Sequence, residues 1–287
     1  MLSQWFLVGA GRCGLQLARA MTAAGIEVVG VEARSPAARA RARRACPGIR
    51  LVRPDAALPP ARGLVVAVPD SALAGCASAL APRIHPATKV ALHTSGLAPA
   101  GVLSPLARAT LRIGSFHPLV AFPSATGPVV DLSGVAAAVE GEPAAVRSAC
   151  ALARALGMRP FVIAAEAKAR YHAAAALAAN LPHALVAVAH AMLVGTGLPR
   201  AIAARALARL AGGAVASAAA ARGMERLTGP IARGDAHAVR AHLDALPERA
   251  AAAYRAVGLL ALEALAAQKL LKESQIHTLE RALTPST

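Results

Sequence analysis

The spacing of the hydrophobic positions changes near residue 164. Before that point, short apolar runs rich in β-branched residues alternate with stretches such as 15–25 and 143–157, whose apolar positions recur at helical spacing. This alternation is typical of βαβ units and predicts a mostly parallel sheet. The strand candidates are WFLVG at 5–9, IEVVGV at 26–31, LVVAVP at 64–69, KVALH at 89–93, RIGSFH at 112–117, VAAAV at 135–139 and FVIA at 161–164.

After residue 165 the β-branched runs give way to long alanine-leucine stretches. These stretches are interrupted at 195–199, 228–230 and 245–248 by glycine or proline, and they predict four or five helices. A chain of 287 residues is long enough for two domains. We therefore predict an α/β protein with an N-terminal Rossmann doubly wound, mostly parallel sheet at 1–164, followed by an all-α domain at 165–287.

The formal charge of +16 does not indicate a nucleic-acid partner. Only four of the 31 basic residues are lysines, the arginines are scattered among alanines and prolines, and aromatic residues make up 2% of the chain. A nucleic-acid surface would concentrate its charge and offer rings for bases to stack on. The four cysteines lie far apart, without metal-ligand spacing, so we expect reduced thiols and no metal.

One stretch, 171–199, is long enough to cross a bilayer and contains no Asp, Glu, Lys or Arg. It holds three histidines and an asparagine, and its apolar content is mostly alanine, which anchors a helix in lipid poorly. The N-terminus also lacks the basic segment of a signal peptide. We predict that this stretch is a buried helix of a soluble, cytoplasmic protein with no membrane partner.

The first strand candidate runs into GAGRCG, which places Gly9, Gly11 and Gly14 in the pattern GxGxxG. The pattern follows a strand and opens an amphipathic helix, as a dinucleotide-binding turn requires. The first glycine permits the tight turn, the second lets the pyrophosphate approach the backbone, and the third lets helix and strand pack closely. With Arg12 and Cys13 between them, these residues are the predicted phosphate cradle.

The second strand ends in GVEARS, which combines two signals for the ribose of the cofactor. An acidic residue such as Glu32 binds the 2'-hydroxyl of NAD, whereas an arginine such as Arg34, with Ser35 beside it, meets the 2'-phosphate of NADP. We favour NADP, with Arg39 adding positive charge one turn into the next helix. At least half of the arginines at 39–44 are expected to form a solvated helix face.

Ligands of open α/β sheets bind beyond the carboxyl ends of the strands, where this chain places several polar loops. A single histidine at a strand end is more often structural, but two such loops on one edge favour a nicotinamide and substrate pocket. The predicted cofactor contacts in these loops are Val68, Pro69, Asp70, His93 and Thr94, and the predicted substrate contacts are Ser95, Gly96 and His117.

The helix that follows the last strand carries a further polar group. Lys168 and His172 are four residues apart and share one face, and Asn180 lies eight residues on, roughly 80° further round. Hydride transfer to a carbonyl leaves an alkoxide that needs an acid, which a partly desolvated Lys168 or His172 can supply. Arg233 is the candidate cation for a substrate carboxylate, with Thr228 near it. The alternative for 227–235 is a helix–helix turn with Asp235 as N-cap.

Four motifs behind GAGRCG carry a resemblance to a known family: HTSG at 93–96, GSFHPL at 114–119, KARYHAAAALAAN at 168–180 and LTGPIARGD at 227–235. In this order they resemble the bacterial family described as a Rossmann-like domain followed by domain of unknown function 2520. That family belongs to the group of 6-phosphogluconate-dehydrogenase-like proteins, which includes ketopantoate reductases and pyrroline-5-carboxylate reductases. The resemblance implies a homodimer that pairs through its helical half.

In the related dehydrogenases a lysine protonates the substrate oxygen and an asparagine four residues on orients it. Here His172 stands at the position of that asparagine, so the resemblance leaves the proton donor undecided between Lys168 and His172. We predict an NADPH-dependent reductase of a small 2-oxo acid, with 2-dehydropantoate (ketopantoate) as the first choice. The alternatives are an imine reductase of the pyrroline-5-carboxylate type and an NADP-binding sensor without turnover.

Overall fold

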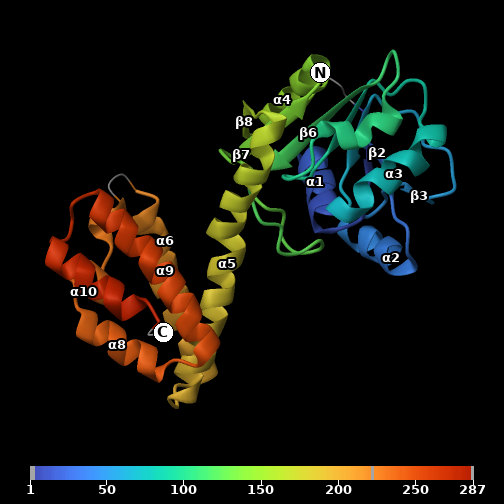
Figure 1. The fold of residues 1–287 in the computed structure, drawn as a ribbon. Coiled ribbons are helices and arrows are strands. Elements are labelled where there is room, and N and C mark those ends of the chain that lie inside the picture. The colour runs from blue at the N-terminus through green and yellow to red at the C-terminus, as the bar shows by residue number, and fades with distance from the viewer. Residues whose placement is uncertain (1–3, 221–222, 286–287) are drawn as a thin grey trace. The chain divides into compact units, whose positions relative to one another are not determined.

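The computed structural model describes residues 4–220 and 223–285. Contacts within the chain divide it into two compact units, Met1–Asn180 and Leu181–Thr287. The division falls inside the long helix α5 (Lys168–Gly195), which appears in yellow in Figure 1. The boundary predicted from the sequence lies earlier, at 164/165, where the last strand has ended and the helices begin.

In the described part of the first unit, eight strands form one sheet in the order β3-β2-β1-β4-β5-β6-β7-β8. The pairs from β3 to β6 are parallel, β7 is antiparallel to β6, and β8 is parallel to β7. The predicted α/β class and mostly parallel sheet are confirmed. The strands are β1 (Gln4–Val8), β2 (Glu27–Glu32), β3 (Leu51–Val52), β4 (Gly63–Val66), β5 (Val90–His93), β6 (Arg112–Pro118), β7 (Ala136–Gly141) and β8 (Arg159–Val162).

Two strands differ from the sequence prediction. The pattern missed β3, because two residues are too short to show an alternation. It also placed the last strand at 161–164, whereas β8 begins at Arg159. Both differences lie at edges of the sheet, where pairing with one neighbour decides the length of a strand.

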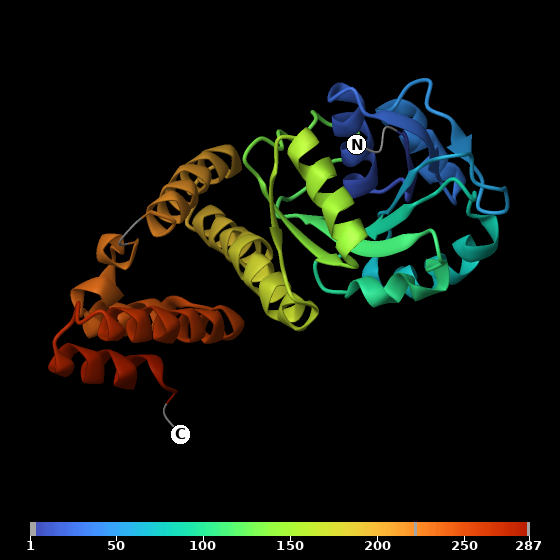
Figure 2. The same cartoon turned by 90° about the horizontal axis from the view of Figure 1, so that it is seen from above.

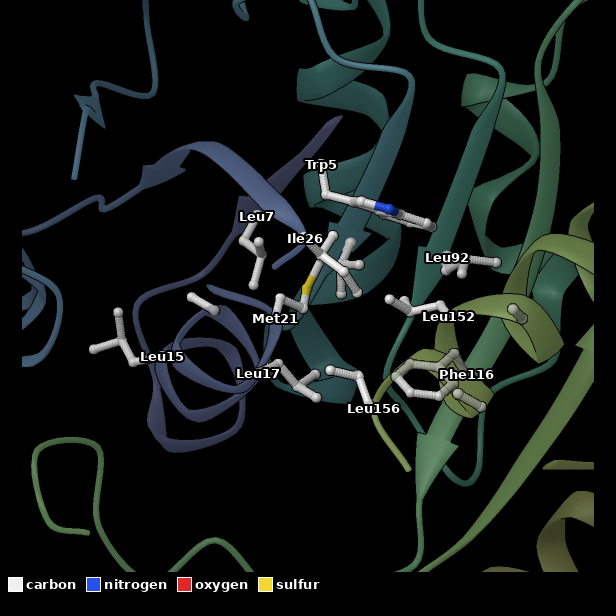
Figure 3. Packing of buried hydrophobic residues seen from close by; sticks show 14 of the residues in the cluster. Trp5, Leu7, Leu15, Leu17, Met21, Ile26, Leu92, Phe116, Leu152 and Leu156 are labelled. Atoms are coloured by element: carbon white, nitrogen blue, oxygen red, sulfur yellow. The ribbon is translucent and has the colours of Figure 1, made fainter. Parts of the chain in front are cut away.

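Side chains of the sheet alternate between two buried layers. Trp5 and Leu7 of β1 belong to one hydrophobic cluster, which Figure 3 shows, and Phe6 and Val8 belong to the other. Each large apolar side chain buried in this way contributes roughly 1.5–3 kcal/mol. The first cluster includes residues of α1 (Arg12–Ala23), α2 (Pro36–Ala45) and α4 (Pro143–Ala155), and the second includes residues of α3 (Leu73–Leu80) and the 3-10 helix η3 (Ala100–Leu106).

The register of the sheet brings several strand ends to one edge. Val8 pairs with Val66, Val66 pairs with His93, and His93 pairs with Ser115, so the loops after β1, β4 and β5 leave the sheet side by side. The first residue of α5, Lys168, is bonded to the loop after β5 and to β6. The predicted phosphate cradle and the predicted polar loops therefore share one edge of the first unit.

The second unit is helical throughout its described ordered elements. Residues of α8, α9 and α10 form its hydrophobic cluster, and Figure 2 shows α9 and α10 side by side in orange-red and red. Helix boundaries lie at the predicted interruptions 195–199, 228–230 and 245–248, but the sequence prediction missed the break between α9 and α10 at 268–272 and the end of α6 at Ala218. The elements are α6 (Arg200–Ala218), the 3-10 helix η5 (Gly223–Arg226), α7 (Pro230–Arg233), α8 (Ala236–Ala245), α9 (Glu248–Ala267) and α10 (Glu273–Leu283).

Two expectations about long apolar helices were wrong. By length and composition, three helices of the described residues are able to cross a membrane, at Ala165–Gly195, α6 and α9, where the sequence indicated only one. The sequence analysis accepted a membrane-spanning stretch only if it contained no charged residue, so it passed over α6 and α9, which contain a few. The stretch at 171–199 was also expected to be buried. In α5 the buried residue is Lys168, which precedes this stretch, and the residues of α5 from 171 onward are partly or fully exposed. Alanines and leucines along these helices, such as Leu210 at 71% exposed and Leu260 at 61%, are uncovered by this chain.

Candidate functional site

The three glycines after β1 form the tight turn that a phosphate cradle requires. Gly9 has a φ of 106°, and a side chain there would collide with the carbonyl oxygen of Ala67. A side chain at Gly14 would collide with the carbonyl oxygen of Gly9, whereas a Cβ at Gly11 would meet nothing within 4 Å. Gly11 is also the N-cap of α1, and no side chain caps that helix. The N-terminus of α1 is therefore uncapped by any described side chain and has free space at Gly11, which fits a pyrophosphate.

A positively charged depression of about 480 Å³ lies next to this turn. Arg12, Arg41 and Arg44 line it together with Gly11 and the loop 123–126. Arg41 donates through Nε to the carbonyl oxygen of Ala10 at 2.8 Å, which fixes its guanidinium against the glycine turn. The sequence analysis did not distinguish Arg41 and Arg44 from the arginines expected on the solvated face of α2. Only the fold brings them beside the glycine turn.

At the end of β2 the acidic and basic candidates are in different environments. The carboxylate of Glu32 accepts a 2.6 Å bond from Arg83, and both side chains are nearly buried. Ser35 caps α2 by accepting from the N–H of Ala38, and Arg39 donates to the carbonyl oxygen of Arg34 at 3.1 Å. The side chain of Arg34 is exposed. Glu32 is thus already paired, while Arg34 is open to a ligand.

The segment after β4 lies between the cradle and the rest of the edge. A Cβ built on Gly9 would lie 3.2 Å from Cγ1 of Val68, and Pro69 precedes the 3-10 helix η1 (Asp70–Ala72). The exposed carboxylate of Asp70 acts electrostatically on His93 and His117, where it raises the pKa against the stronger effect of burial. Asp70 is therefore the acidic group of this edge that acts on both histidines.

His93 is fully buried at the end of β5 and shapes the loop that follows it. Its Nδ1 accepts from the N–H of Ser95 at 3.2 Å, so its Nε2 carries the proton and donates to the carbonyl oxygen of Pro99 at 3.3 Å. Burial, with the nearby Lys168 charge, lowers the pKa of His93 to about 4. Both ring nitrogens are used within the protein, so the predicted cofactor contact of the His93 side chain does not fit. The residue acts structurally.

The next residue, Thr94, joins this loop to the phosphate cradle. It hydrogen-bonds the thiol of Cys13 in the first turn of α1, and burial raises the pKa of that thiol to about 11. The hydroxyl of Ser95 accepts from the N–H groups of Leu97 and Ala98, at 3.1 and 2.9 Å. The loop is held at both ends, with Gly96 between these fixed points.

Lys168 does not face open space, contrary to its predicted contact with a substrate. Its side chain is 1% exposed, and its ammonium donates to Ser115 Oγ at 2.8 Å and to the carbonyl oxygen of Ser95 at 3.3 Å. Glu140 Oε2 lies 3.8 Å from the ammonium and also accepts from the N–H of Ala100 at 2.8 Å. Burial lowers the pKa of Lys168, and Glu140 opposes this effect. The ammonium is enclosed by protein acceptors, so the role of proton donor does not fit this arrangement.

Three aromatic rings meet beside Gly96. The hydroxyl of Tyr171 lies 2.8 Å from Nδ1 of His117, and the rings of His117 and His172 are 5.8 Å apart. A Cβ built on Gly96 would lie 2.7 Å from Nδ1 of His172 and 2.9 Å from Nε2 of His117. Nδ1 of His172 is buried without a hydrogen-bond partner among the described residues. Burial and the neighbouring His172 lower the pKa of His117 to about 4, so this ring is neutral at pH 7.

The remaining predicted residues are not part of this group. Asn180 is exposed on α5 and lies eight residues beyond His172, about 12 Å along the helix axis, so its predicted place in the same pocket does not fit. Thr228 and Arg233 are exposed in the second unit, where Asp235 caps α8 and Gly234 is in the left-handed conformation. The helix–helix turn considered for this segment is confirmed. The contact of Arg233 with a carboxylate stays a prediction.

Two functional candidates were missed from the sequence. Tyr171 lies one residue before His172, and its spacing on the helix alone gave it no role. Glu140 lies near the end of the alanine-rich strand β7, outside any motif, and only the antiparallel pairing of β7 with β6 places it opposite Ser115. Both became visible once the strand order and the position of α5 were known.

Comparison with known proteins agrees with the two-part organisation. A model of a Rossmann-like domain matches residues 4–118, and a model of domain of unknown function 2520 matches residues 135–261. The chain therefore contains a Rossmann-like domain followed by domain of unknown function 2520, the arrangement of the family that its motifs resemble. None of the curated proteins gives a match.

Solved structures of similar fold come from several organisms. One is a Bacteroides fragilis protein provisionally named an NADP oxidoreductase, with 20% identity, a TM-score of 0.72 and coverage of 97% of this chain and 98% of the other. Protein TM1727 from Thermotoga maritima has 21% identity and a TM-score of 0.69 over 92% and 99% of the two chains. Pyrroline carboxylate reductase from Plasmodium falciparum, with NADP bound, has 14% identity and a TM-score of 0.55 over 98% and 96%. At these identities the likeness shows a shared fold.

Proposed function

We propose that the protein is an NADPH-dependent reductase of a small carbonyl compound, with a 2-oxo acid as the substrate class and 2-dehydropantoate as the first compound to test. The observation that carries this proposal is the position of Nδ1 of His172. This nitrogen has no hydrogen-bond partner within residues 4–220 and 223–285, and it lies beside Gly96 on the edge that also holds the open glycine turn. A buried nitrogen without a partner costs free energy, and a ligand atom would supply the missing bond.

The distance between the two parts of this edge suits a dinucleotide. Thr94 touches the first turn of α1 through Cys13, and Gly96, two residues on, lies against the imidazoles. Two residues of extended chain span about 7 Å. If α1 held the pyrophosphate of a dinucleotide, the loop at 94–96 would be the part of this chain nearest to its nicotinamide half, as the general rule for ligands of open α/β sheets expects.

His172 and Lys168 have different roles in the proposed reaction. The bound nicotinamide supplies a hydride to the carbonyl carbon. His172 holds the carbonyl oxygen and gives it a proton from Nδ1 as the carbon–oxygen π electrons move onto that oxygen. Lys168, enclosed by Ser95, Ser115 and Glu140, keeps the loop at 95–100 in place and adds positive potential behind the site.

NADP is the proposed cofactor because only one of the two residues expected at its ribose is open to a ligand. Glu32 is bound to Arg83, so its carboxylate is engaged, whereas the guanidinium of Arg34 is exposed at the end of β2. A 2'-phosphate there would gain a charge-assisted bond. The positive depression formed by Arg12, Arg41 and Arg44 adds attraction for the phosphates.

An imine reductase of the pyrroline-5-carboxylate type is the second candidate. It is favoured by the likeness to the Plasmodium falciparum reductase, which extends over nearly the whole of both chains. The test for both is the oxidation of NADPH by purified protein with a panel of 2-oxo acids and cyclic imines, with NADH run in parallel. Oxidation by a 2-oxo acid with NADPH preferred supports the proposal. Binding of NADPH without turnover of any compound would instead indicate a sensor.

We further propose that the active form is a cytoplasmic homodimer. Apolar side chains of α6 and α9 are exposed in the single chain, among them Leu210, Val215, Val257 and Leu260, each at least half exposed. A second copy would remove this surface from water. Light scattering on the detergent-free protein should give twice the mass of one chain, and a monomer, or a requirement for detergent, would contradict this proposal.

A further inference from the structure

The positively charged depression beside the glycine turn is large enough to hold a ligand. Its volume is about 480 Å³, and ligand sites in proteins commonly measure about 300–1,000 Å³. It is lined by Gly11 and Arg12 after β1, by Arg41 and Arg44 of α2, and by the loop 123–126. Only the first of these parts belongs to the GxGxxG pattern, so the depression contains groups that the pattern does not describe.

The guanidinium groups of the depression are not balanced by carboxylates. Arg41 and Arg44 are three residues apart on α2 and therefore share one face of the helix. Within residues 4–220 and 223–285, no ion pair joins Arg12, Arg41 or Arg44 to a carboxylate, and no acidic residue is among those that line the depression. Like charges that face one space repel each other. An anion with more than one negative charge would relieve this repulsion.

Arg41 is fixed against the glycine turn by the protein itself. Its Nε donates to the carbonyl oxygen of Ala10 at 2.8 Å, and the residue is half-buried. This bond uses one of the N–H groups of the guanidinium and leaves those on its terminal nitrogens for an acceptor in the depression. Ala10 precedes Gly11, the N-cap of α1, so the guanidinium lies beside the uncapped end of that helix.

A buried glutamine holds the loop 123–126 to α1. Gln16 is 1% exposed, and its amide nitrogen donates to the carbonyl oxygens of Ser124 and Pro128, at 2.7 and 3.0 Å. Its amide oxygen accepts from the N–H of Val130 at 3.0 Å. A buried amide that bonds through both of its polar atoms to one loop fixes that loop relative to the helix. The loop that lines the depression therefore has a defined position beside the arginines.

We propose that this depression binds the diphosphate of the nucleotide cofactor, so that Arg41 and Arg44 of α2 hold the diphosphate together with the first turn of α1. This inference rests on the proposed function and deepens it. A diphosphate carries more than one negative charge, and its oxygens accept paired bonds from guanidinium groups. Arg34, the residue expected at the 2'-phosphate, does not line the depression, whereas Gly11 does. The diphosphate is therefore the part of the cofactor that this position fits.

The experiment compares Arg44→Ala with a matched control on the same helix. Arg43→Ala removes the neighbouring arginine, which is also exposed but does not line the depression. Arg12→Ala is the second test variant, because it removes a guanidinium from a different helix. All three replaced residues are exposed, so the variants should fold, and circular dichroism checks this. Calorimetric titration of the full chain measures the affinity for NADPH, NADH and ADP-ribose, which share the diphosphate, whereas only NADPH has the 2'-phosphate.

We expect Arg44→Ala and Arg12→Ala to weaken the binding of NADPH, NADH and ADP-ribose by about tenfold each, and Arg43→Ala to leave all affinities within about twofold. Equal affinity of the wild-type protein and Arg44→Ala for ADP-ribose overturns the inference but leaves an NADPH-dependent reductase. A loss confined to NADPH also overturns it, since the depression would then hold the 2'-phosphate. If the wild-type protein binds none of these compounds, the inference and the proposed function both fail.

Discussion

Replacing single glycines of the turn after β1 separates cofactor binding from folding. A Cβ at Gly11 meets nothing within 4 Å, and the residue has a φ of −81°, which alanine adopts readily. Gly11→Ala should therefore change the free energy of unfolding by less than about 1 kcal/mol, the usual range for an N-cap change. A Cβ at Gly14 would instead collide with the carbonyl oxygen of Gly9, so Gly14→Ala should cost 3 kcal/mol or more, or prevent folding.

Gly11→Ala is expected to weaken NADPH binding strongly, although it changes the free energy of unfolding little. The added methyl group would occupy the space in front of the first-turn N–H groups of α1 and push the pyrophosphate away from them. Loss of one charge-assisted hydrogen bond costs about 1.5–3 kcal/mol, which is roughly a 10- to 150-fold weaker Kd. Fluorescence titration with NADPH measures the affinity, and urea denaturation measures the stability.

A second glycine-to-alanine change provides the control. Gly212 lies inside α6, and a Cβ there also meets nothing within 4 Å, so Gly212→Ala adds the same methyl group in the second unit. It should leave NADPH affinity unchanged and stabilise the helix slightly. The placement of the pyrophosphate on α1 is refuted if Gly11→Ala folds normally and binds NADPH as tightly as the wild-type protein.

Three further predictions concern the buried groups and the ribose site. Because the pKa values of fully buried His93 and of His117 both fall from 6.5 to about 4 on folding, the unfolded chain binds protons that the folded chain does not between these values. The free energy of unfolding should therefore drop as pH falls from 6.5 to 4, with about 3 kcal/mol of the drop contributed by His93 and a further part by His117. Urea titrations across this range check it, and a flat profile contradicts it. Lys168→Met should lower the free energy of unfolding by about 3–5 kcal/mol, because it leaves the Glu140 carboxylate without its cation. The double variant with Glu140→Gln should recover part of this loss. Equal stability of the single and double variants would contradict the pairing. Arg34→Ala should weaken NADPH binding at least tenfold but leave NADH binding unchanged. Replacing Arg43, which is also exposed, by alanine is the control. Equal losses of affinity for both cofactors would exclude a contact with the 2'-phosphate.

The sheet and the glycine turn after β1 were predictable from the sequence because their signals are local. Apolar residues at alternate positions define each strand, and three glycines at fixed spacing after a strand need only the adjacent helix to be interpreted. The structure adds the physical reason for each glycine: a positive φ at Gly9, close packing at Gly14 and open space at Gly11. The predicted helix breaks in the second half were also local, since proline and glycine mark them.

The composition of the site was less predictable because its contacts are distant in the chain. The spacing of Lys168 and His172 places both on one face of a helix, but it does not show that Lys168 enters a pocket made by Ser115 and Glu140. That pocket exists only because β7 pairs antiparallel with β6, a register that no short motif encodes. For the same reason His93 appeared to be a cofactor contact, although the loop it shapes uses both of its ring nitrogens.

The helical half shows a related limit. Length and alanine content predicted the helices of the second unit, but the sequence does not state which of their apolar residues one chain covers. The exposed leucines of α6 and α9 show that this chain leaves much of that surface open. These leucines lie on two helices that are far apart in sequence, so no local pattern marks them as uncovered.

The central claim is that His172 protonates a substrate oxygen on the edge that holds the cofactor. Its most direct test is a single-turnover experiment in which protein saturated with NADPH is mixed with 2-dehydropantoate or another 2-oxo acid that the wild-type protein reduces. His172→Ala is predicted to bind NADPH with unchanged affinity and to oxidise it at least 100-fold more slowly, as expected for loss of a general acid. Oxidation at the wild-type rate by His172→Ala would contradict the claim.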